Sequence, residues 1–233
     1  MVVRYKYLLK FPFGASFNKD LKYLIYSSLF REIKKITCIN LEGTCETCPL
    51  SDTCIYYHLS GENFNNYPGV IIDRFIVEKR KFKSDEIIEL NIYLFQSLIK
   101  FEGFIRKFIE DNNNFFDHFY QIIKFDKEII KIDGTYDGDI LAVTPISQID
   151  KINNQLEYYN DKYDTNFNLK FEIFEVNTKK VKDRNNYYIN GVRINLEGLV
   201  GELKVNNLDK ILFTIGIGKQ NFFGGGKIHE NKN

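Results

Sequence analysis

The 233-residue sequence contains no tryptophan, one methionine, four prolines and three histidines. Few histidines restrict acid–base chemistry at neutral pH, because histidine alone titrates there without a perturbed pKa. A net charge of +1 excludes a uniformly basic protein, so any nucleic-acid surface must be a local patch. No segment approaches the roughly 20 apolar residues of a membrane span, and the first residues, MVVRYKYLLKF, lack the apolar core of a signal peptide. We therefore expect a soluble, cytoplasmic protein with no membrane partner.

The apolar share of 44% is enough for a core, and the length allows one large domain or two small ones. Hydrophobic patterning in residues 1–145 predicts a strand at 2–11, a helix capped by Ser16 or Asn18, strands at 69–82 and 85–95, a helix at 97–110, and short strands at 119–125 and 128–132. This order favours an α+β, ferredoxin-like sandwich over a parallel sheet. Residues 146–233 form a second part, with a helix at 148–163 and strands at 169–176, 187–196 and 200–205.

The first predicted helix has two different faces. Its apolar stripe comprises Leu21, Leu24, Ile25, Ser28, Leu29, Ile33 and Ile36, at the spacing of a buried helix face. The remaining face carries Lys19, Lys22, Tyr23, Tyr26, Ser27, Phe30, Arg31, Lys34 and Lys35. Such a face is either simply solvated or binds RNA, since aromatic rings stack on bases while lysines hold phosphates.

All four cysteines lie in one segment, as Cys38, Cys45, Cys48 and Cys54. A C-x-x-C pair with two flanking cysteines favours a metal over disulfides inside a cell, and four thiolates can form a structural zinc site. Two disulfides, free thiols and an iron–sulfur cluster are the alternatives. Redox catalysis by Cys45 and Cys48 lacks the surrounding βαβ pattern of thioredoxin-like proteins.

The end of the chain, ILFTIGIGKQNFFGGGKI, is rich in glycine. Residues 211–215 predict a buried strand, and the glycines that follow permit positive φ angles. Successive N–H groups in such a turn can form an anion-binding concavity flanked by lysines. The candidate phosphate-binding residues are Gly216, Gly218, Lys219, Gly224, Gly225, Gly226 and Lys227; a glycine-rich hairpin that binds nothing is the alternative. The position at the chain end argues against a dinucleotide fingerprint, which opens a helix early in a βαβ unit.

A basic stretch that contains Lys179, Lys180, Lys182 and Arg184 lies before the glycine-rich segment. Arg193 lies between the two. The basic stretch predicts either a solvated loop or a patch that supports RNA binding.

Three segments resemble a known family in its own order. They are TCETCPLSDTCIYYHLSGE, DEIIELNIYLFQSLIKFEGFIRKFIE and GLVGELKVNNLDKILFTIGIGKQNFFGGGKI, and together they span most of the chain. They are similar to segments of the CRISPR-associated endoribonucleases that process precursor CRISPR RNA, within the repeat-associated RAMP superfamily.

The resemblance implies two tandem ferredoxin-like (RRM-like) domains, here 1–145 with the cysteine-rich insertion and a short 146–233 with the glycine-rich loop. It also implies CRISPR repeat RNA as partner and metal-independent cleavage by the 2′-hydroxyl, which leaves a cyclic phosphate and a 5′-hydroxyl. The alternative is a non-catalytic RAMP subunit that binds guide RNA beside other subunits of an effector complex. The chain would act as a monomer or a homodimer. No cofactor is needed for cleavage.

The sequence departs from the family in its histidines. Members often carry a catalytic histidine in or just after the first helix, and residues 17–37 contain none. A glycine-rich turn is also missing after the second helix, where DNNNFFDHFYQ stands. We therefore take His58, Tyr26 and Lys34 as catalytic candidates and add Arg31 to the RNA-binding set, because lysine and tyrosine can position the attack and stabilise charge.

Overall fold

The computed structural model describes residues 2–39, 45–73, 79–182 and 187–231. The first part of the chain contains β1 (Val2–Phe11), β2 (Ala15–Ser16), α1 (Leu21–Thr37), the 3-10 helix η1 (Ser51–Thr53), α2 (Ile55–Ser60), β3 (Val70–Ile72), β4 (Lys81–Phe82), β5 (Glu86–Phe95), the 3-10 helix η2 (Gln96–Phe101), α3 (Glu102–Glu110), β6 (Asn114–Phe115), β7 (His118–Phe119) and β8 (Gln121–Ile130). The predicted strand 2–11 is confirmed. The two short strands predicted within 119–132 are mostly one long strand, β8.

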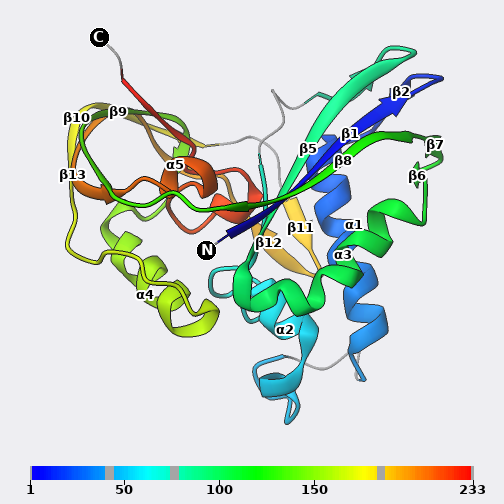
Figure 1. Ribbon diagram of the computed structural model, residues 1–233, viewed down its shortest axis with the longest axis horizontal. Helices are drawn as coiled ribbons and strands as arrows, with labels where there is room; N and C mark the ends of the chain where they lie inside the picture. The colour runs from blue at the N-terminus through cyan, green and yellow to red at the C-terminus, as the bar shows by residue number, and fades with distance from the viewer. Residues whose placement is uncertain (1, 40–44, 74–78, 183–186, 232–233) are drawn as a thin grey trace.

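The first sheet is antiparallel, in the order β3-β5-β1-β8. Alternate residues of its central strand β1, from Val3 to Phe11, are fully buried, as expected for a strand with one face on the core. Helices α1 and α3 lie on that side of the sheet (Figure 1). A tyrosine-rich core follows, because Tyr5 and Tyr7 extend from β1 toward α3, where their hydroxyls donate to Glu102 and Glu110.

Helix α1 begins slightly later than predicted. Its cap is Asp20, whose Oδ1 accepts a hydrogen bond from the Tyr23 backbone N–H at 2.9 Å, and neither Ser16 nor Asn18 takes that role. The stripe Leu21, Leu24, Ile25, Ser28, Leu29 and Ile33 is buried as predicted, but Ile36 is 64% exposed near the last turn.

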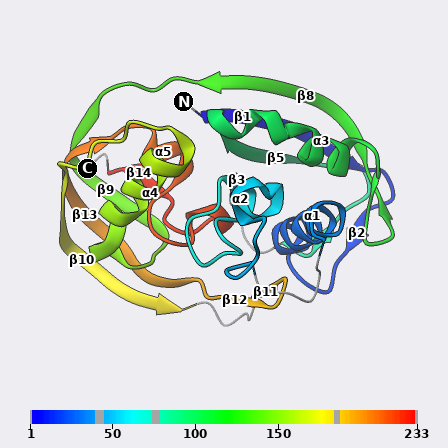
Figure 2. The same ribbon diagram turned by 90° about the horizontal axis from the view of Figure 1, so that it is seen from below.

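The second part of the chain contains β9 (Thr135–Ile146), the 3-10 helix η3 (Ile149–Lys151), α4 (Ile152–Tyr163), β10 (Glu172–Lys182), β11 (Tyr187–Ile189), β12 (Val192–Ile194), β13 (Glu197–Asp209), α5 (Leu212–Ile215), the 3-10 helix η4 (Asn221–Phe223) and β14 (Ile228–Glu230). The second sheet has the order β10-β13-β9-β14 and is also antiparallel. Figure 2 shows this sheet beside the first one, with β11 and β12 extending from it below α1.

Three expectations about this part need correction. Residues 212–215 form the short helix α5 instead of a buried strand, although Leu212 and Ile215 are buried as predicted. The basic stretch at 179–182 belongs to strand β10 and not to a loop. Strand β9 pairs with β13 and β14, so the two sheets divide between Ile130 and Thr135, ahead of the predicted boundary at 145.

The fold class is therefore α+β with two antiparallel sheets, as predicted. Among the described residues, no helix is both long and apolar enough to cross a membrane.

Candidate nucleic-acid interface

The aromatic face of α1 is buried, which corrects the expectation that it lies outside. Tyr26 and Phe30 are fully buried, and Lys22 and Tyr23 are 7% and 8% exposed. The Tyr26 hydroxyl donates to the Val70 carbonyl at 3.1 Å, and burial raises the pKa of this tyrosine well above its usual value. Tyr26 is thus part of the core and cannot take a proton from RNA in this arrangement.

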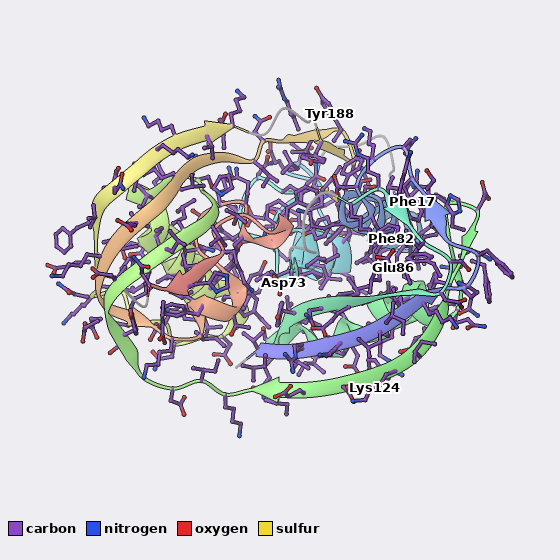
Figure 3. The ribbon with its side chains drawn as sticks, turned by 90° about the horizontal axis from the view of Figure 1, so that it is seen from above. Phe17, Asp73, Phe82, Glu86, Lys124 and Tyr188 are labelled. Atoms are coloured by element: carbon purple, nitrogen blue, oxygen red, sulfur yellow. The ribbon has the colours of Figure 1, made fainter. Side chains whose placement is uncertain are left out.

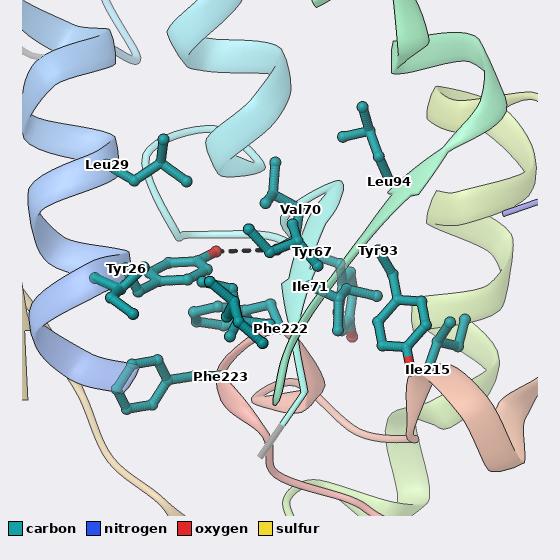
Figure 4. Close-up of a cluster of buried hydrophobic side chains, with 14 of the residues drawn as sticks. Tyr26, Leu29, Tyr67, Val70, Ile71, Tyr93, Leu94, Ile215, Phe222 and Phe223 are labelled. Atoms are coloured by element: carbon teal, nitrogen blue, oxygen red, sulfur yellow. Dashed lines mark hydrogen bonds between the residues drawn. The ribbon is translucent and has the colours of Figure 1, made fainter. Parts of the chain in front are cut away.

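Side chains from the end of the chain cover this face together with Tyr56 and Phe64 of the first part. The Phe222 ring lies 5.5 Å from that of Tyr26, and the Phe223 ring lies 5.8 Å from it (Figure 4). Lys22 fixes the contact, because its Nζ donates to the Phe223 carbonyl at 2.7 Å and lies 4.2 Å from the ring centroid. Burying an ammonium group is unfavourable unless it finds such partners. The glycine-rich segment is therefore an internal link between the two parts of the chain.

The N–H groups of the glycines are used inside the protein. Gly218 N–H donates to Gln155 Oε1 at 2.7 Å, Gly226 N–H to the Pro145 carbonyl at 2.8 Å, and Gly225 N–H to the Gln220 carbonyl at 2.9 Å. Gly216 and Gly224 donate to the carbonyls of Leu212 and Asn221. The positive φ angles predicted for a glycine-rich turn are present at Gly216, Gly218, Gly224 and Gly226, but an anion-binding concavity built from these N–H groups is not.

The two lysines of this segment differ in their surroundings. Lys227 Nζ pairs with Asp73 of the first part at 3.1 Å, so its charge is already compensated. Lys219 is half-buried and forms no salt bridge with the described residues. Only Lys219 retains a free charge for a phosphate.

A hairpin from the second part lies along α1. Strands β11 and β12 join through Asn190 and Gly191, both at positive φ, the pattern of a tight two-residue turn. Tyr23 Oη donates to the Tyr188 carbonyl at 2.9 Å, and Asn190 Nδ2 donates to Tyr56 Oη at 3.0 Å. Tyr187 and Ile189 are buried beneath it, whereas Tyr188 is 50% exposed.

Several cations belong to the elements next to this hairpin, and we call them together with Tyr188 the hairpin surface. Its members are Lys19, just before α1, Arg31 and Lys34 of α1, Tyr188 and Arg193 of the hairpin, and Lys179, Lys180 and Lys182 of β10. Lys19 Nζ lies 4.8 Å from the Tyr23 ring and Lys34 Nζ 5.8 Å from the Tyr56 ring, which places them at the two ends of the hairpin contact. Arg193 is the register partner of Tyr188. Lys182 ends β10 at the base of the hairpin and pairs with Glu197 at 3.1 Å.

Arg193 and Lys34, both predicted site residues, thus lie on two elements that contact each other, although they are far apart in the sequence. Arg184 lies outside the described residues. An exposed aromatic ring near positive charges can stack on a base while the charges hold phosphates.

Comparison with known proteins identifies solved structures with a similar fold. No family model and no curated protein sequence matches the chain. Among solved structures, a RAMP protein binding different RNA substrates is similar over 99% of this chain and all of its own, at 14% identity and a TM-score of 0.56. A Cas6 product complex matches at 11% identity and a TM-score of 0.55, over 98% of this chain and 99% of its own. A Cas6-related protein from Pyrococcus furiosus covers both chains completely, at 14% identity and a TM-score of 0.52.

The chain shares the fold of these Cas6 and RAMP proteins. The likeness covers both parts of the chain, and at these identities it establishes architecture and not chemistry. The predicted resemblance is confirmed to that extent.

The three histidines of this Cas6-like fold lie apart from one another. His58, in the last turn of α2, has its Nε2 2.7 Å from the carbonyl of Asp52 in η1. His118 Nε2 is 3.0 Å from the Ser16 carbonyl, and His229 is exposed on β14. On α2, Tyr56 contacts α1, and two residues further His58 points about 200° away around the helix. The structure therefore does not bring His58 and Lys34 together as a pair.

The cysteines show no ready metal site. Cys38, Cys45, Cys48 and Cys54 are half-buried and not disulfide-bonded, and among the described residues no three His, Cys, Asp or Glu side chains gather to hold an ion. Burial raises the pKa of Cys45, and the neighbouring thiols raise it further against the opposing effect of Lys34. The fold of this segment alone does not present a zinc ligand set, so zinc stays a prediction that metal analysis of the purified protein would test.

Sequence reasoning missed two functional features. The patterning predicts strands within 187–196 but not their pairing, which the dipeptide Asn190–Gly191, a strong hairpin signal, could have indicated. Lys22 had no such signal, because nothing local distinguishes a lysine that will be buried from one that stays in water.

Proposed function

We propose that this chain is a RAMP protein that binds CRISPR repeat RNA on the hairpin surface. The observation that carries the proposal is that the hairpin with the exposed Tyr188 and its register partner Arg193 contacts Tyr23 and Tyr56, the two rings beside Lys19 and Lys34. The shared fold with a RAMP protein binding RNA and with a Cas6 product complex supports it. A net charge of +1 is compatible with this reading, because the cations are gathered locally.

We further infer that each part is a ferredoxin-like unit. In the first, β1, α1, β3, β5, α3 and β8 follow one another, and in the second β9, α4, β10, β13, α5 and β14. Both sheets place the second, third, first and fourth strands side by side in that order. The division between the units then falls within 131–134.

Cleavage of the repeat is the finer part of the proposal. A metal-independent reaction requires that the 2′-hydroxyl lose its proton, that the leaving 5′-oxygen gain one, and that charge on the phosphorane be stabilised. Lys34 and Arg31 are placed to stabilise that charge if the scissile phosphate lies on the hairpin surface. His58 would reach the RNA only by giving up its contact with the Asp52 carbonyl, and Tyr26 is withdrawn from the set because it is buried.

The alternative is a non-catalytic RAMP subunit that holds guide RNA within an effector complex. The position of the histidines favours this alternative, since His58 and His118 are bonded to backbone carbonyls and His229 lies on the second sheet. Binding is common to both proposals, and only cleavage distinguishes them.

The deciding experiment incubates the purified protein with end-labelled repeat RNA in excess EDTA. A matched substrate carries one deoxyribose 5′ of the cut. Cleavage of the ribose form alone establishes attack by the 2′-hydroxyl, and Lys34→Ala and His58→Ala then assign the roles. Tight binding without cleavage supports the guide-RNA subunit, and absence of binding contradicts both proposals.

The salt dependence of binding tests the surface itself. For single-stranded RNA, log affinity falls with log salt by about 0.7 for each phosphate neutralised. Lys34→Ala should lower this slope by about that amount. Lys204→Ala removes an exposed charge on β13, in the second sheet, and should leave the slope unchanged. Equal effects of both variants would mean that the RNA does not lie on the hairpin surface.

A further inference from the structure

Aromatic side chains are exposed at one end of the first sheet, away from the core. Phe13 is 83% exposed in the turn between β1 and β2, and Phe116 and Phe119 of the β6–β7 hairpin are 42% and 37% exposed. The Phe13 and Phe119 rings lie 6.4 Å apart. Together with Lys81 and Lys83 we call these residues the aromatic end. Single exposed apolar residues are common on proteins, whereas exposed rings that gather in one place mark an interaction site.

A second layer of rings holds this end in place. Phe17 packs against Phe82 at 5.9 Å and against the His118 ring at 4.8 Å, and His118 in turn bonds to the Ser16 carbonyl. Figure 3 shows Phe17 and Phe82 side by side at this end of the sheet. The Phe13 turn rests on the next loop, because the Asp85 N–H donates to the Phe11 carbonyl at 2.8 Å and Ser84 Oγ donates to that of Pro12. The exposed rings are thus held in position by packed aromatic side chains and by hydrogen bonds between the loops.

The hairpin that presents Phe116 is strained. Phe116 and Asp117 form its two-residue turn with φ angles of 49° and 66°. Such turns favour Asn-Gly, since only a residue with little steric bulk adopts this backbone at low cost. An exposed phenylalanine in this position brings no burial to offset the strain. Outliers of this kind are found at functional sites more often than elsewhere.

Positive charge surrounds the rings. The sequence of residues 79–83 is KRKFK, and β4 carries its Lys81 and Phe82. Lys79 pairs with Glu86, whereas Lys81 and Lys83 are exposed and form no salt bridge with any described residue. The interior of a protein–protein interface is depleted of lysine. Lysines interleaved with exposed rings are instead typical of surfaces that bind single-stranded nucleic acid.

The aromatic end is continuous with the hairpin surface. Ser16, the register partner of Lys81, lies only a few residues before α1, and Lys19 lies between them. Lys19 reaches the Tyr23 ring, whose hydroxyl contacts the hairpin. A strand of RNA that leaves the hairpin surface past Lys19 would therefore meet Lys81 and the exposed rings next.

We propose that the aromatic end binds unpaired nucleotides that flank the RNA held on the hairpin surface, with bases stacked on Phe13 and Phe119 and phosphates held by Lys81 and Lys83. The proposal rests on the proposed function in that RNA is the ligand. It adds a second region that contacts RNA, and this region differs from the hairpin surface in the kind of RNA that it prefers. Stacking accepts any base, so this region selects for single strands and not for sequence.

The absence of tryptophan from the chain supplies a direct probe. The variant Phe13→Trp contains one tryptophan, and base stacking should quench its fluorescence when RNA is added. Phe174→Trp is the control, because Phe174 is also an exposed phenylalanine, at 49% against 83% for Phe13, and lies on β10 of the second sheet. Dye-labelled repeat RNA with a ten-nucleotide single-stranded extension is titrated into each variant, and anisotropy of the dye reports total binding in the same sample.

The expected result is quenching in Phe13→Trp, little change in Phe174→Trp, and less quenching by repeat RNA without the extension. Phe13→Ala should weaken binding of the extended RNA by about 5-fold or more and leave the unextended RNA unaffected. Lys81→Ala with Lys83→Ala should reduce the salt slope for extended RNA only.

The two proposals fail in different ways. If anisotropy does not rise, RNA does not bind and the proposed function fails together with this inference. If anisotropy rises but the Phe13→Trp signal is unchanged, RNA binds elsewhere and only this inference is overturned. Equal quenching in Phe13→Trp and Phe174→Trp also overturns it, since contact would then be nonspecific.

Discussion

The two parts of the chain have the same strand order but differ at their second helix. In the first part, η2 and α3 span residues 96–110 and pack on their own sheet through Leu98, Ile105 and Ile109. In the second part, α5 has four residues, and the glycine-rich segment and η4 follow it before the last strand. Phe222 and Phe223 of that segment pack on α1 of the first part.

Because the second helix of the second part is short, the segment that follows it can extend to the first part. A full helix would bury its apolar face on its own sheet, whereas a compact coil can extend across to a neighbour. Glycine is required there because Gly226 has a φ of +62° and a Cβ would lie 1.6 Å from the Ile217 carbonyl oxygen. The second part thus gives up an internal contact and gains the one that joins the halves.

Replacing a glycine by alanine in each of these two segments should change the free energy of unfolding in opposite directions, and this is the largest effect we expect. Gly226→Ala should lower the free energy of unfolding by about 3 kcal/mol or more, through backbone strain and a steric clash. Gly103→Ala, on α3, places its Cβ where no atom lies within 4 Å and should raise it by about 0.5–1 kcal/mol. Urea unfolding followed by circular dichroism measures both.

If the urea midpoint of Gly226→Ala equals that of the unmodified protein within error, the segment does not need the positive φ angle at this position. A lower midpoint for Gly103→Ala would contradict the open surroundings of that position.

The buried lysine at the junction should have a smaller effect. Lys22→Met keeps the apolar stem but removes the donor to the Phe223 carbonyl, which should cost about 1–3 kcal/mol. Lys35→Met on the same helix removes an exposed pair with Glu32 and should cost less than about 1 kcal/mol. If both variants unfold at the same urea concentration, Lys22 does not stabilise the junction.

The ion pair between the parts should matter least. The side chains of Lys227 and Asp73 are each 22% exposed, so water screens their attraction. A double-mutant cycle with Lys227→Met and Asp73→Asn should give a coupling of about 0.5–1 kcal/mol. The coupling should shrink as salt is added. A coupling that does not change with salt would mean that the contact is not electrostatic.

Local patterns in the sequence were enough to predict most helices and strands of the first part. The alternation in β1 and the stripe on α1 predict which side chains are buried, because both periods are set by the backbone itself. The aromatic face of α1 could not be predicted in this way. Its covering residues lie near the other end of the chain, and periodicity carries no information about such a distant partner.

The glycine-rich segment shows where composition stops being informative. Glycines correctly indicate positive φ at Gly216 and Gly226, but composition cannot tell whether their N–H groups face a ligand or the protein. Here Gln155 and Pro145, from α4 and β9, accept two of these N–H groups. The candidate site was found in part, since Lys34 and Arg193 were predicted, while the hairpin that connects them was not.

The junction between Lys22 and Phe223 also has a consequence for synthesis of the chain. These two residues are 201 positions apart, so α1 is made long before the segment that carries Phe223. At 5–20 residues per second, translation of that interval takes roughly 10 to 40 seconds. During this time the aromatic side of α1 lacks Phe222 and Phe223, and Tyr26 and Phe30 can pack only on nearby residues such as Tyr56 and Phe64. Synthesis of the glycine-rich segment, and not the folding of the first sheet, would then complete the core.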